Sequence, residues 1–167
     1  MSRIEVVRRF YDAVERSDLA GVLSCLAENV VWHGPSPLVP AGRVYHGLSD
    51  LKSRWLGDFL EIYPEYWARP KEYVESEDLV IAIGEHGARI SGVLTAMPMA
   101  HIWRVHGGKI VGARFFTDTA GMIEALNRSA FPVTPSGQQQ VDLPRWSVSQ
   151  LSSGGFAPVP PSQRSRP

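Results

Sequence analysis

The sequence contains a single cysteine, Cys25, so no internal disulfide is possible. A framework of several disulfides, of the kind that holds small secreted domains together, is therefore excluded. Cys25 lies in the apolar stretch Val22–Leu26, which indicates a buried thiol with a packing role. We expect a cytoplasmic protein.

Charge of either sign is not in excess, because 17 lysine and arginine residues balance 17 aspartate and glutamate residues. A chain without a basic excess has little to neutralise phosphates, which argues against nucleic-acid binding. No apolar run reaches the roughly 18 residues that cross a bilayer, so we expect no membrane span. The charged segment Ser2–Arg9 is typical of an amphipathic helix rather than of a signal peptide.

Metal-ligand spacing is missing as well. The five histidines include no pair four residues apart, and the chain has no Cys-x-x-Cys pattern. The glycines at Gly84 and Gly107-Gly108 have no phosphate-loop context. We expect neither a metal ion nor a cofactor.

Hydrophobic periodicity predicts one α+β domain over residues 1–130. Helices are expected at Ser2–Arg16, Leu19–Ala27, Leu48–Leu60 and Thr119–Asn127. Strands are expected at Asn29–Trp32, Tyr66–Val74, Leu79–Glu85, Ser91–Val105 and Lys109–Asp118, with a loop at Gly34–Gly42. A curved sheet of mostly antiparallel strands, covered by the N-terminal helices, would enclose a conical cavity.

The composition changes after Ala130. Seven of the thirteen prolines lie in residues 131–167, together with runs rich in glutamine, serine and glycine. This composition predicts an extended or disordered tail rather than a second domain. The alternative is a tail that is clipped onto a neighbouring surface by Trp146 or Phe156, two of its large aromatic residues.

The most informative segment is the predicted hairpin His101–Asp118, which turns at Gly107-Gly108. Strict alternation along its second strand places four residues on one face, namely Gly112, Arg114, Phe116 and Asp118. A cavity on that face would explain why a carboxylate lies beside an arginine and a phenylalanine. Such a carboxylate is a candidate acid or base.

The segment Phe10–Trp32, the following Gly47 and the Gly-Gly-Lys-Ile hairpin resemble the nuclear-transport-factor-two-like, or ketosteroid-isomerase-like, superfamily. Within it the chain is most similar to the SnoaL-like group, named for a polyketide cyclase, over about Ser2 to Asn127. The resemblance implies a cone-shaped mixed sheet with the N-terminal helices over its concave face. It leaves the activity open, because the superfamily includes isomerases, cyclases, dehydratases, hydrolases and non-catalytic binders.

Two site patterns of this superfamily are absent. Ketosteroid isomerases carry a base aspartate where this chain has Gly34, and a protonated aspartate where it has His101. Their oxyanion tyrosine falls near Phe10, one step along the helix from Tyr11. The Arg-x-Asp of limonene epoxide hydrolases is replaced by His101-Ile-Trp103. The resemblance therefore implies neither of these two activities.

The SnoaL-like cyclases match better. Their acid/base aspartate begins a stretch similar to Asp118-Thr-Ala-Gly-Met-Ile-Glu-Ala-Leu126, and a histidine and an arginine coincide with His101 and Arg114. The resemblance thus implies that Asp118 is the acid/base group and that His101 assists it. The loop before the histidine strand is shorter here, at Thr95–Met99, so we expect a different substrate lid.

Each candidate has an alternative role. Asp118 also fits a helix N-cap, and His101 could be held by a neighbouring strand instead of forming a proton relay with Asp118. Six residues are candidates for contact with a ligand, namely Arg114, Trp103, Phe116, Trp32, Tyr11 and His46. The aromatic side chains could equally be core, and Arg114 could pair with Glu85 or Asp118.

Two hypotheses follow. The first is a cofactor-independent general acid/base enzyme that acts on a small hydrophobic carbonyl compound by isomerisation, aldol-type cyclisation or dehydration. The alternative is a non-catalytic domain that binds a small molecule or dimerises. We also expect a homodimer through the outer face of the sheet, because Val111, Ala113 and Phe115 would otherwise lack cover.

Overall fold

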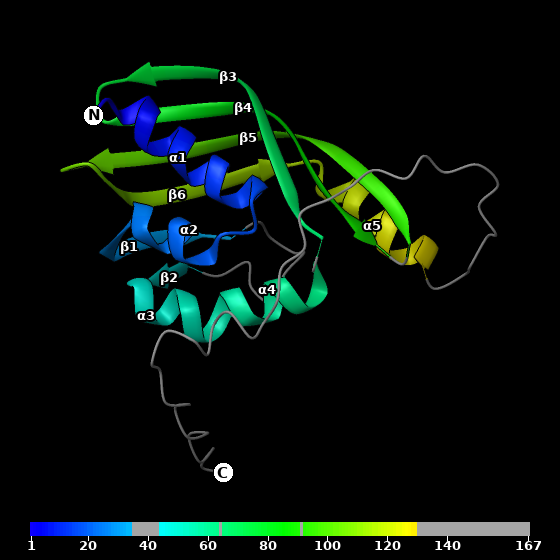
Figure 1. Cartoon of the computed structure of the whole chain (residues 1–167). Coiled ribbons are helices and arrows are strands. Elements are labelled where there is room, and N and C mark those ends of the chain that lie inside the picture. Colours follow the sequence, from blue (N-terminus) through cyan, green and yellow to red (C-terminus); the bar gives the residue numbers. More distant parts are fainter. Residues whose placement is uncertain (35–43, 64, 91, 130–167) are drawn as a thin grey trace, which may run out of the picture.

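The computed structural model describes residues 1–34, 44–63, 65–90 and 92–129. In this part of the chain, six strands form one strongly curved sheet, and helices cover its concave side (Figure 1). The strand order is β2-β1-β6-β5-β4-β3, with β1 and β6 parallel and every other pair antiparallel. The predicted α+β class is confirmed. Most of the predicted loop at Gly34–Gly42 and the whole predicted tail, 131–167, lie outside the described residues.

The helices lie where the periodicity predicts them. They are α1 (Arg3–Glu15), α2 (Leu19–Cys25), α3 (Leu48–Leu51), α4 (Gly57–Ile62) and α5 (Thr119–Ser129). A π-helical turn, η1 (Lys52–Leu56), joins α3 to α4, so the predicted helix Leu48–Leu60 is one continuous helical segment with a local widening.

The strands are β1 (Leu26–His33), β2 (Val44–His46), β3 (Trp67–Ser76), β4 (Leu79–Ile90), β5 (Val93–His106) and β6 (Lys109–Thr117). Three of the predicted strands, at β1, β3 and β4, are longer in the structure, whereas the two at β5 and β6 are one residue shorter. The short edge strand β2 was not predicted. Strands β4 and β5 form a long ribbon whose far end extends beyond α1 and contacts α5 (Figure 1).

Local capping explains where the first two helices begin. Ser2 and Glu5 form a reciprocal capping box, in which the Ser2 hydroxyl accepts a bond of 3.2 Å from the Glu5 amide. Asp18 then caps α2, because its Oδ1 accepts a bond of 2.8 Å from the amide of Gly21. Ser17 makes the tight connection between α1 and α2 with a positive φ of 50°.

Period-two alternation decides which side chains of β5 face the helices. The buried residues are Met97, Met99, His101, Trp103 and Val105, whereas Pro98 and Arg104 are exposed. In the register of the sheet, His101 lies between Ala82 of β4 and Phe115 of β6. His101 therefore lies on the concave, helix-covered face.

Strand β6 departs from strict alternation, and this overturns one sequence-based prediction. Arg104 pairs with Gly112 but Val105 pairs with Ile110, so Val111 is an extra residue, a β-bulge. The bulge shifts the phase by one residue: Ile110 faces the core, and after it Ala113 and Phe115 do so. The expected cavity face, with Gly112, Arg114, Phe116 and Asp118, is instead the outer side of the strand.

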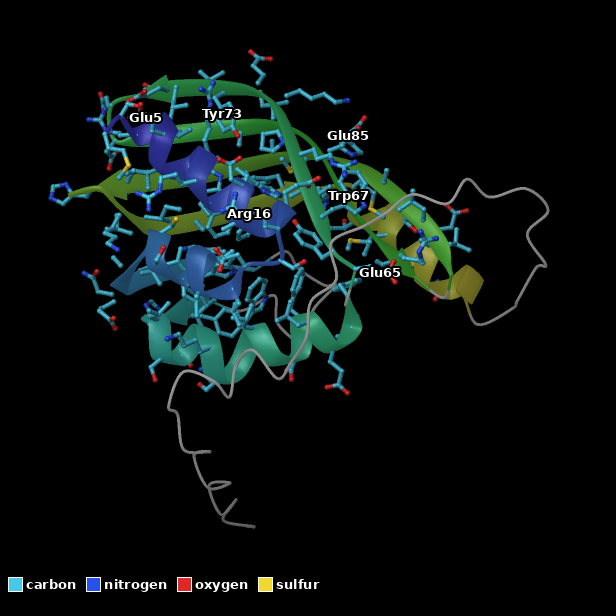
Figure 2. All side chains as sticks on the ribbon, viewed as in Figure 1. Glu5, Arg16, Glu65, Trp67, Tyr73 and Glu85 are labelled. Carbon is cyan, nitrogen blue, oxygen red and sulfur yellow. The ribbon has the colours of Figure 1, made fainter. Side chains whose placement is uncertain are left out.

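The core fills the space between the concave face and the helices, whereas charged side chains such as Glu85 lie at the periphery (Figure 2). Helix α1 packs across β3 to β6, and α2 follows it on β1 (Figure 1). Trp103 and Ile110 are fully buried at the centre of this layer. Cys25 is a buried free thiol, as its apolar surroundings predict.

Candidate functional site

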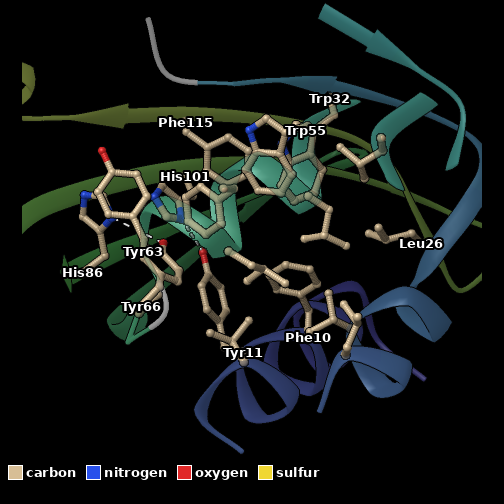
Figure 3. Close-up of a pocket in the computed structure, with 18 of the residues that line it drawn as sticks. Phe10, Tyr11, Leu26, Trp32, Trp55, Tyr63, Tyr66, His86, His101 and Phe115 are labelled. Carbon is tan, nitrogen blue, oxygen red and sulfur yellow. Dashed lines mark hydrogen bonds between the residues drawn. The ribbon is translucent and has the colours of Figure 1, made fainter. Parts of the chain in front are cut away.

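A cavity lies between the concave face of the sheet and the helices that cover it (Figure 3). The volume open to the centre of a water molecule is about 80 Å³, enough for a small organic molecule or several waters. Aliphatic and aromatic side chains from α1, α2 and the α3–α4 segment form most of its wall. Besides the indole N–H groups of Trp32 and Trp55, the polar side chains of the wall are Tyr11, Tyr63, Tyr66, His86, His101 and Thr117.

The structure brings three of the predicted site residues to this cavity, namely Tyr11, Trp32 and His101. Trp103 lies directly behind them. It is fully buried, and its indole Nε1 donates a hydrogen bond of 3.0 Å to the Tyr11 hydroxyl. Two of the proposed ligand contacts therefore line the cavity, and a third supports them from the core.

Asp118 lies elsewhere, and the expectation that it shares a cavity with His101 is wrong. Its side chain is exposed, and its Oδ1 accepts a hydrogen bond of 3.0 Å from the amide of Gly121 at the start of α5. The same arrangement, with a 2.8 Å bond, caps α2 at Asp18 and Gly21. The Asp-x-x-Gly pattern that resembles the cyclase motif is therefore used twice in this chain as a helix cap.

Three other candidates also lie away from the cavity wall. Arg114 is exposed, and Phe116 is 50% exposed on the outer face of the sheet, because the bulge in β6 turns both outward. His46 is exposed on the edge strand β2, where its backbone amide donates to Asp50 Oδ2 at 3.1 Å. Glu85, a possible partner for Arg114, pairs with Lys71 at 3.0 Å.

His101 is the best-defined polar group at the cavity. It is 2% exposed, and its Nδ1 lies 2.8 Å from the Tyr11 hydroxyl. Burial, with a smaller contribution from the neighbouring His86, holds the pKa of His101 well below its usual 6.5. His101 is thus a neutral imidazole at physiological pH. Its Nε2 makes no hydrogen bond within the described part of the chain.

His86 is a second buried histidine, which the sequence analysis did not select. Its ring lies 5.5 Å from that of His101, centroid to centroid. Its Nε2 lies 2.5 Å from the hydroxyl of Thr117, and its Nδ1 lies 3.3 Å from that of Tyr66. Burial lowers the pKa of His86 to about 4. The signal available in the sequence is the alternation Val80, Ala82, Gly84, His86, which places the histidine on an apolar face.

The cavity wall carries no formal charge at physiological pH, as far as the described residues define it. It includes no Asp, Glu, Lys or Arg side chain, and both histidines are neutral. Burial also raises the pKa values of Tyr11 and Tyr66 well above 10, so both phenols stay protonated. No group of three or more His, Cys, Asp or Glu side chains in the described ranges is placed to hold a metal ion.

Aromatic rings continue the wall beside the hydrogen-bonding groups (Figure 3). Trp32 lies 5.0 Å from Trp55 and 4.7 Å from Phe115, centroid to centroid, and Trp55 stacks on Phe59 at 4.6 Å. Such a wall favours a flat or apolar ligand, because ring faces add contact area at little conformational cost. The site therefore combines an apolar enclosure with a few hydrogen-bonding groups at one end.

Comparisons with known proteins agree with this architecture. A family profile described as a SnoaL-like domain matches residues 7–113. An NTF2-like protein of unknown function from Burkholderia pseudomallei K96243 is similar in structure, with a TM-score of 0.69 and 28% identity over 75% of this chain and 98% of that chain. The predicted nuclear-transport-factor-two-like fold is confirmed.

Two further structures share the fold at lower identity. TerC, crystallised with polyporic acid, has a TM-score of 0.68 and 22% identity over 74% of this chain and 97% of that one. IdmH from Streptomyces antibioticus, for which polyketide cyclase activity has been suggested, has a TM-score of 0.61 and 22% identity over 76% and 99%. A search of curated protein sequences found no match. Among the described helices, none has the length and apolar character that crossing a membrane requires.

Proposed function

Because the chain belongs to the SnoaL-like domain family, we propose that it is a cofactor-independent enzyme that moves a proton next to the carbonyl group of a small hydrophobic compound. The reaction is an isomerisation, an aldol-type cyclisation or a dehydration. One observation carries the proposal. His101 is a buried, neutral imidazole whose Nε2 has no partner in the described part of the chain and lies at an apolar cavity.

In this proposal His101 polarises the carbonyl oxygen. A neutral imidazole N–H can donate a hydrogen bond to an oxygen that gains negative charge as the neighbouring C–H bond breaks. The low dielectric of a buried cavity strengthens such a bond relative to water. The Tyr11 hydroxyl, 2.8 Å from Nδ1, keeps the ring in place.

The adjacent proton needs an acceptor, and His86 is the basic group nearest to His101 in the wall. Its Nδ1 lies 3.3 Å from the Tyr66 hydroxyl, a long hydrogen bond, so Nδ1 can give up this bond and accept a proton from a substrate. A pKa of about 4 makes His86 a weak base. The substrate must therefore carry an activated C–H bond, flanked by a second carbonyl or by a conjugated system. Asp118, as the exposed cap of α5, takes no part in this step.

The test is proton exchange, which requires no knowledge of the product. 2-Tetralone, whose C1–H is activated by both the carbonyl and the aromatic ring, and conjugated ketones are incubated with the protein in D₂O, and loss of the C–H signal is followed by NMR. We expect exchange above the buffer rate with at least one compound, and a decrease of about 10²–10⁴-fold in His101→Phe. His106→Phe is the matched control, because His106 is exposed in the hairpin turn.

One observation favours the alternative, a binding domain without catalysis: the cavity wall offers neither a carboxylate nor a charged group. The exchange experiment distinguishes the two. Compounds that bind in the cavity but exchange no faster than in buffer would assign the binding role. Full exchange activity in His101→Phe would remove this histidine from the reaction.

A further inference from the structure

The hydrogen bonds around Tyr11 form a relay that runs from Trp103 through Tyr11 to His101. Figure 3 shows the part of it between Tyr11 and His101. The indole Nε1 of Trp103 can only donate, so the Tyr11 oxygen accepts that bond of 3.0 Å. The other bond of this hydroxyl is the 2.8 Å contact with His101 Nδ1. The direction of this second bond decides where the proton of His101 lies.

Only one direction satisfies all three groups. If His101 Nδ1 donated, the Tyr11 oxygen would accept twice and its own proton would lack an acceptor among the described residues. A buried O–H without a partner is costly. The Tyr11 hydroxyl therefore donates to Nδ1. In a neutral imidazole with Nδ1 as acceptor, the proton is on Nε2.

The Nε2–H of His101 is then an unpaired donor at the cavity. Among the described residues, the indole Nε1 groups of Trp32 and Trp55, which also line the cavity, lack a partner too. His86 offers no comparable group, because Thr117 donates to the carbonyl of Pro98 at 3.2 Å and so accepts from His86 Nε2. Tyr66 is left to donate to His86 Nδ1. The hydrogen-bonding end of the cavity thus presents a donor that has no acceptor among the residues the structure describes.

We propose that the Trp103–Tyr11 relay fixes His101 as a hydrogen-bond donor towards the cavity, so that the cavity selects an uncharged, flat ligand that presents an acceptor oxygen. Tyr11 is in this sense a positioning residue, acting through His101. The inference rests on the proposed function for the identity of the site. It goes further in excluding ligands: a carboxylate would enter an uncharged cavity without a counter-ion, at a large desolvation cost.

The first test reads the tautomer directly. Nitrogen-15 NMR of the histidine side chains distinguishes a protonated ring nitrogen from an unprotonated one. In the ligand-free protein we expect His101 with the proton on Nε2. In Tyr11→Phe the donor to Nδ1 is lost, and we expect a mixture of tautomers. Tyr73→Phe is the matched control, because Tyr73 packs 6.5 Å from the Tyr11 ring and has neither a hydrogen bond nor a ring contact with His101 among the described residues. A proton on Nδ1 in the wild type would overturn the proposal.

The second test measures binding by tryptophan fluorescence with three compounds on one bicyclic skeleton. These are 1-tetralone, tetralin, which lacks the oxygen, and 1,2,3,4-tetrahydro-1-naphthoate, which is charged. We expect the ketone to bind about tenfold more tightly than the hydrocarbon, the ratio given by one well-made hydrogen bond. The carboxylate should bind more weakly than either. In His101→Phe, the ketone and the hydrocarbon should bind equally.

Equal binding of ketone and hydrocarbon to the wild type, or tight binding of the carboxylate, would overturn the proposal. Both tests use the ligand-free protein or binding alone, so they stand apart from turnover. Selective ketone binding without proton exchange would end the proposed enzyme and leave this inference in place. If Tyr11→Phe fails to fold, the wild-type tautomer and the ligand series still decide.

Discussion

The hydroxyl of Tyr11 and the imidazole of His101 come from positions 90 residues apart and meet at 2.8 Å. Helix α1 supplies one and strand β5 the other, and Trp103, two residues from His101, donates to the same hydroxyl. The contact therefore joins the helical layer to the sheet with buried hydrogen bonds. It also sets the chemistry of the cavity wall, so stability and function are linked at this point.

This link predicts the effect of removing the Tyr11 hydroxyl. Tyr11→Phe leaves both Trp103 Nε1 and His101 Nδ1 without a buried partner. At about 1–3 kcal/mol for each of the two unsatisfied groups, we expect a loss of about 2–6 kcal/mol in the free energy of unfolding. Urea denaturation measures it. Tyr73→Phe should change stability by less than about 0.5 kcal/mol. An equal loss in both variants would show that the hydrogen bonds of the Tyr11 hydroxyl add no stability beyond that of an ordinary tyrosine.

The two buried histidines predict a dependence of stability on pH. The unfolded chain binds a proton at His86 below about pH 6.5, whereas the folded protein does so only below about pH 4. The pKa of His101 is lowered in the same direction. Stability is therefore complete above about pH 6.5 and decreases as the pH falls through this window, by up to about 1.4 kcal/mol per pH unit for each histidine.

Urea midpoints between pH 7.5 and 5 measure this slope. His86→Gln should flatten it, because one of the buried groups whose pKa is lowered is removed. His106→Gln is the matched control, because His106 is exposed in the hairpin turn. A slope that survives intact in His86→Gln would show that other groups cause the acid sensitivity.

Asp118 is expected to matter for stability and not for chemistry. Asp118→Ala removes the acceptor for the Gly121 amide and should cost about 0.5–2 kcal/mol, whereas Asp118→Asn keeps an acceptor and should cost much less. Both variants should retain proton exchange and ligand binding. Asp18→Ala, at the matching cap of α2, should behave alike in denaturation. Loss of exchange in Asp118→Asn at unchanged stability would restore the catalytic role.

The outer face of the sheet carries the remaining prediction, a homodimer. Ala113 and Phe115, from which the sequence argument for a dimer started, are covered by the protein's own core. A different row of residues lies on the outer face, where Ile83 pairs with Ala100 and Ala100 pairs with Phe116. The side chains of Ile83 and Phe116 are 40% and 50% exposed. We expect two copies to meet on this row. Light scattering should give a dimer for the wild type and a monomer for Phe116→Glu.

His101 and Tyr11 could be placed from the sequence because nothing interrupts the repeat of their elements. Strand β5 alternates regularly from Met97 to Val105, and α1 keeps one apolar face, so the side on which each residue lies follows from counting. The capping role of Asp118 was also available, since Asp-x-x-Gly at a helix start is a local signal.

The error over Asp118 and the omission of His86 have physical causes. A β-bulge such as the one at Val111 depends on how two strands pair, and the residues of this segment do not predict it. His86 reaches the cavity through the register of β4 on β5, and its partner Thr117 lies 31 residues away. Contacts of this kind are fixed by tertiary packing, which single-sequence periodicity does not contain.

The bulge in β6 also allows the shape of the cavity to change without a change in the residues that line it, two properties that substitutions usually alter together. Val111 is one residue more than the pairing needs, so the residues after it would keep their faces if it were deleted. Ala113, Phe115 and Thr117 would still point inward, but the strand would lose its local bend and added twist. Deletion of Val111 would therefore change the shape of the cavity while leaving its lining residues as they are. This offers a way to engineer the size of the molecule that the cavity accepts.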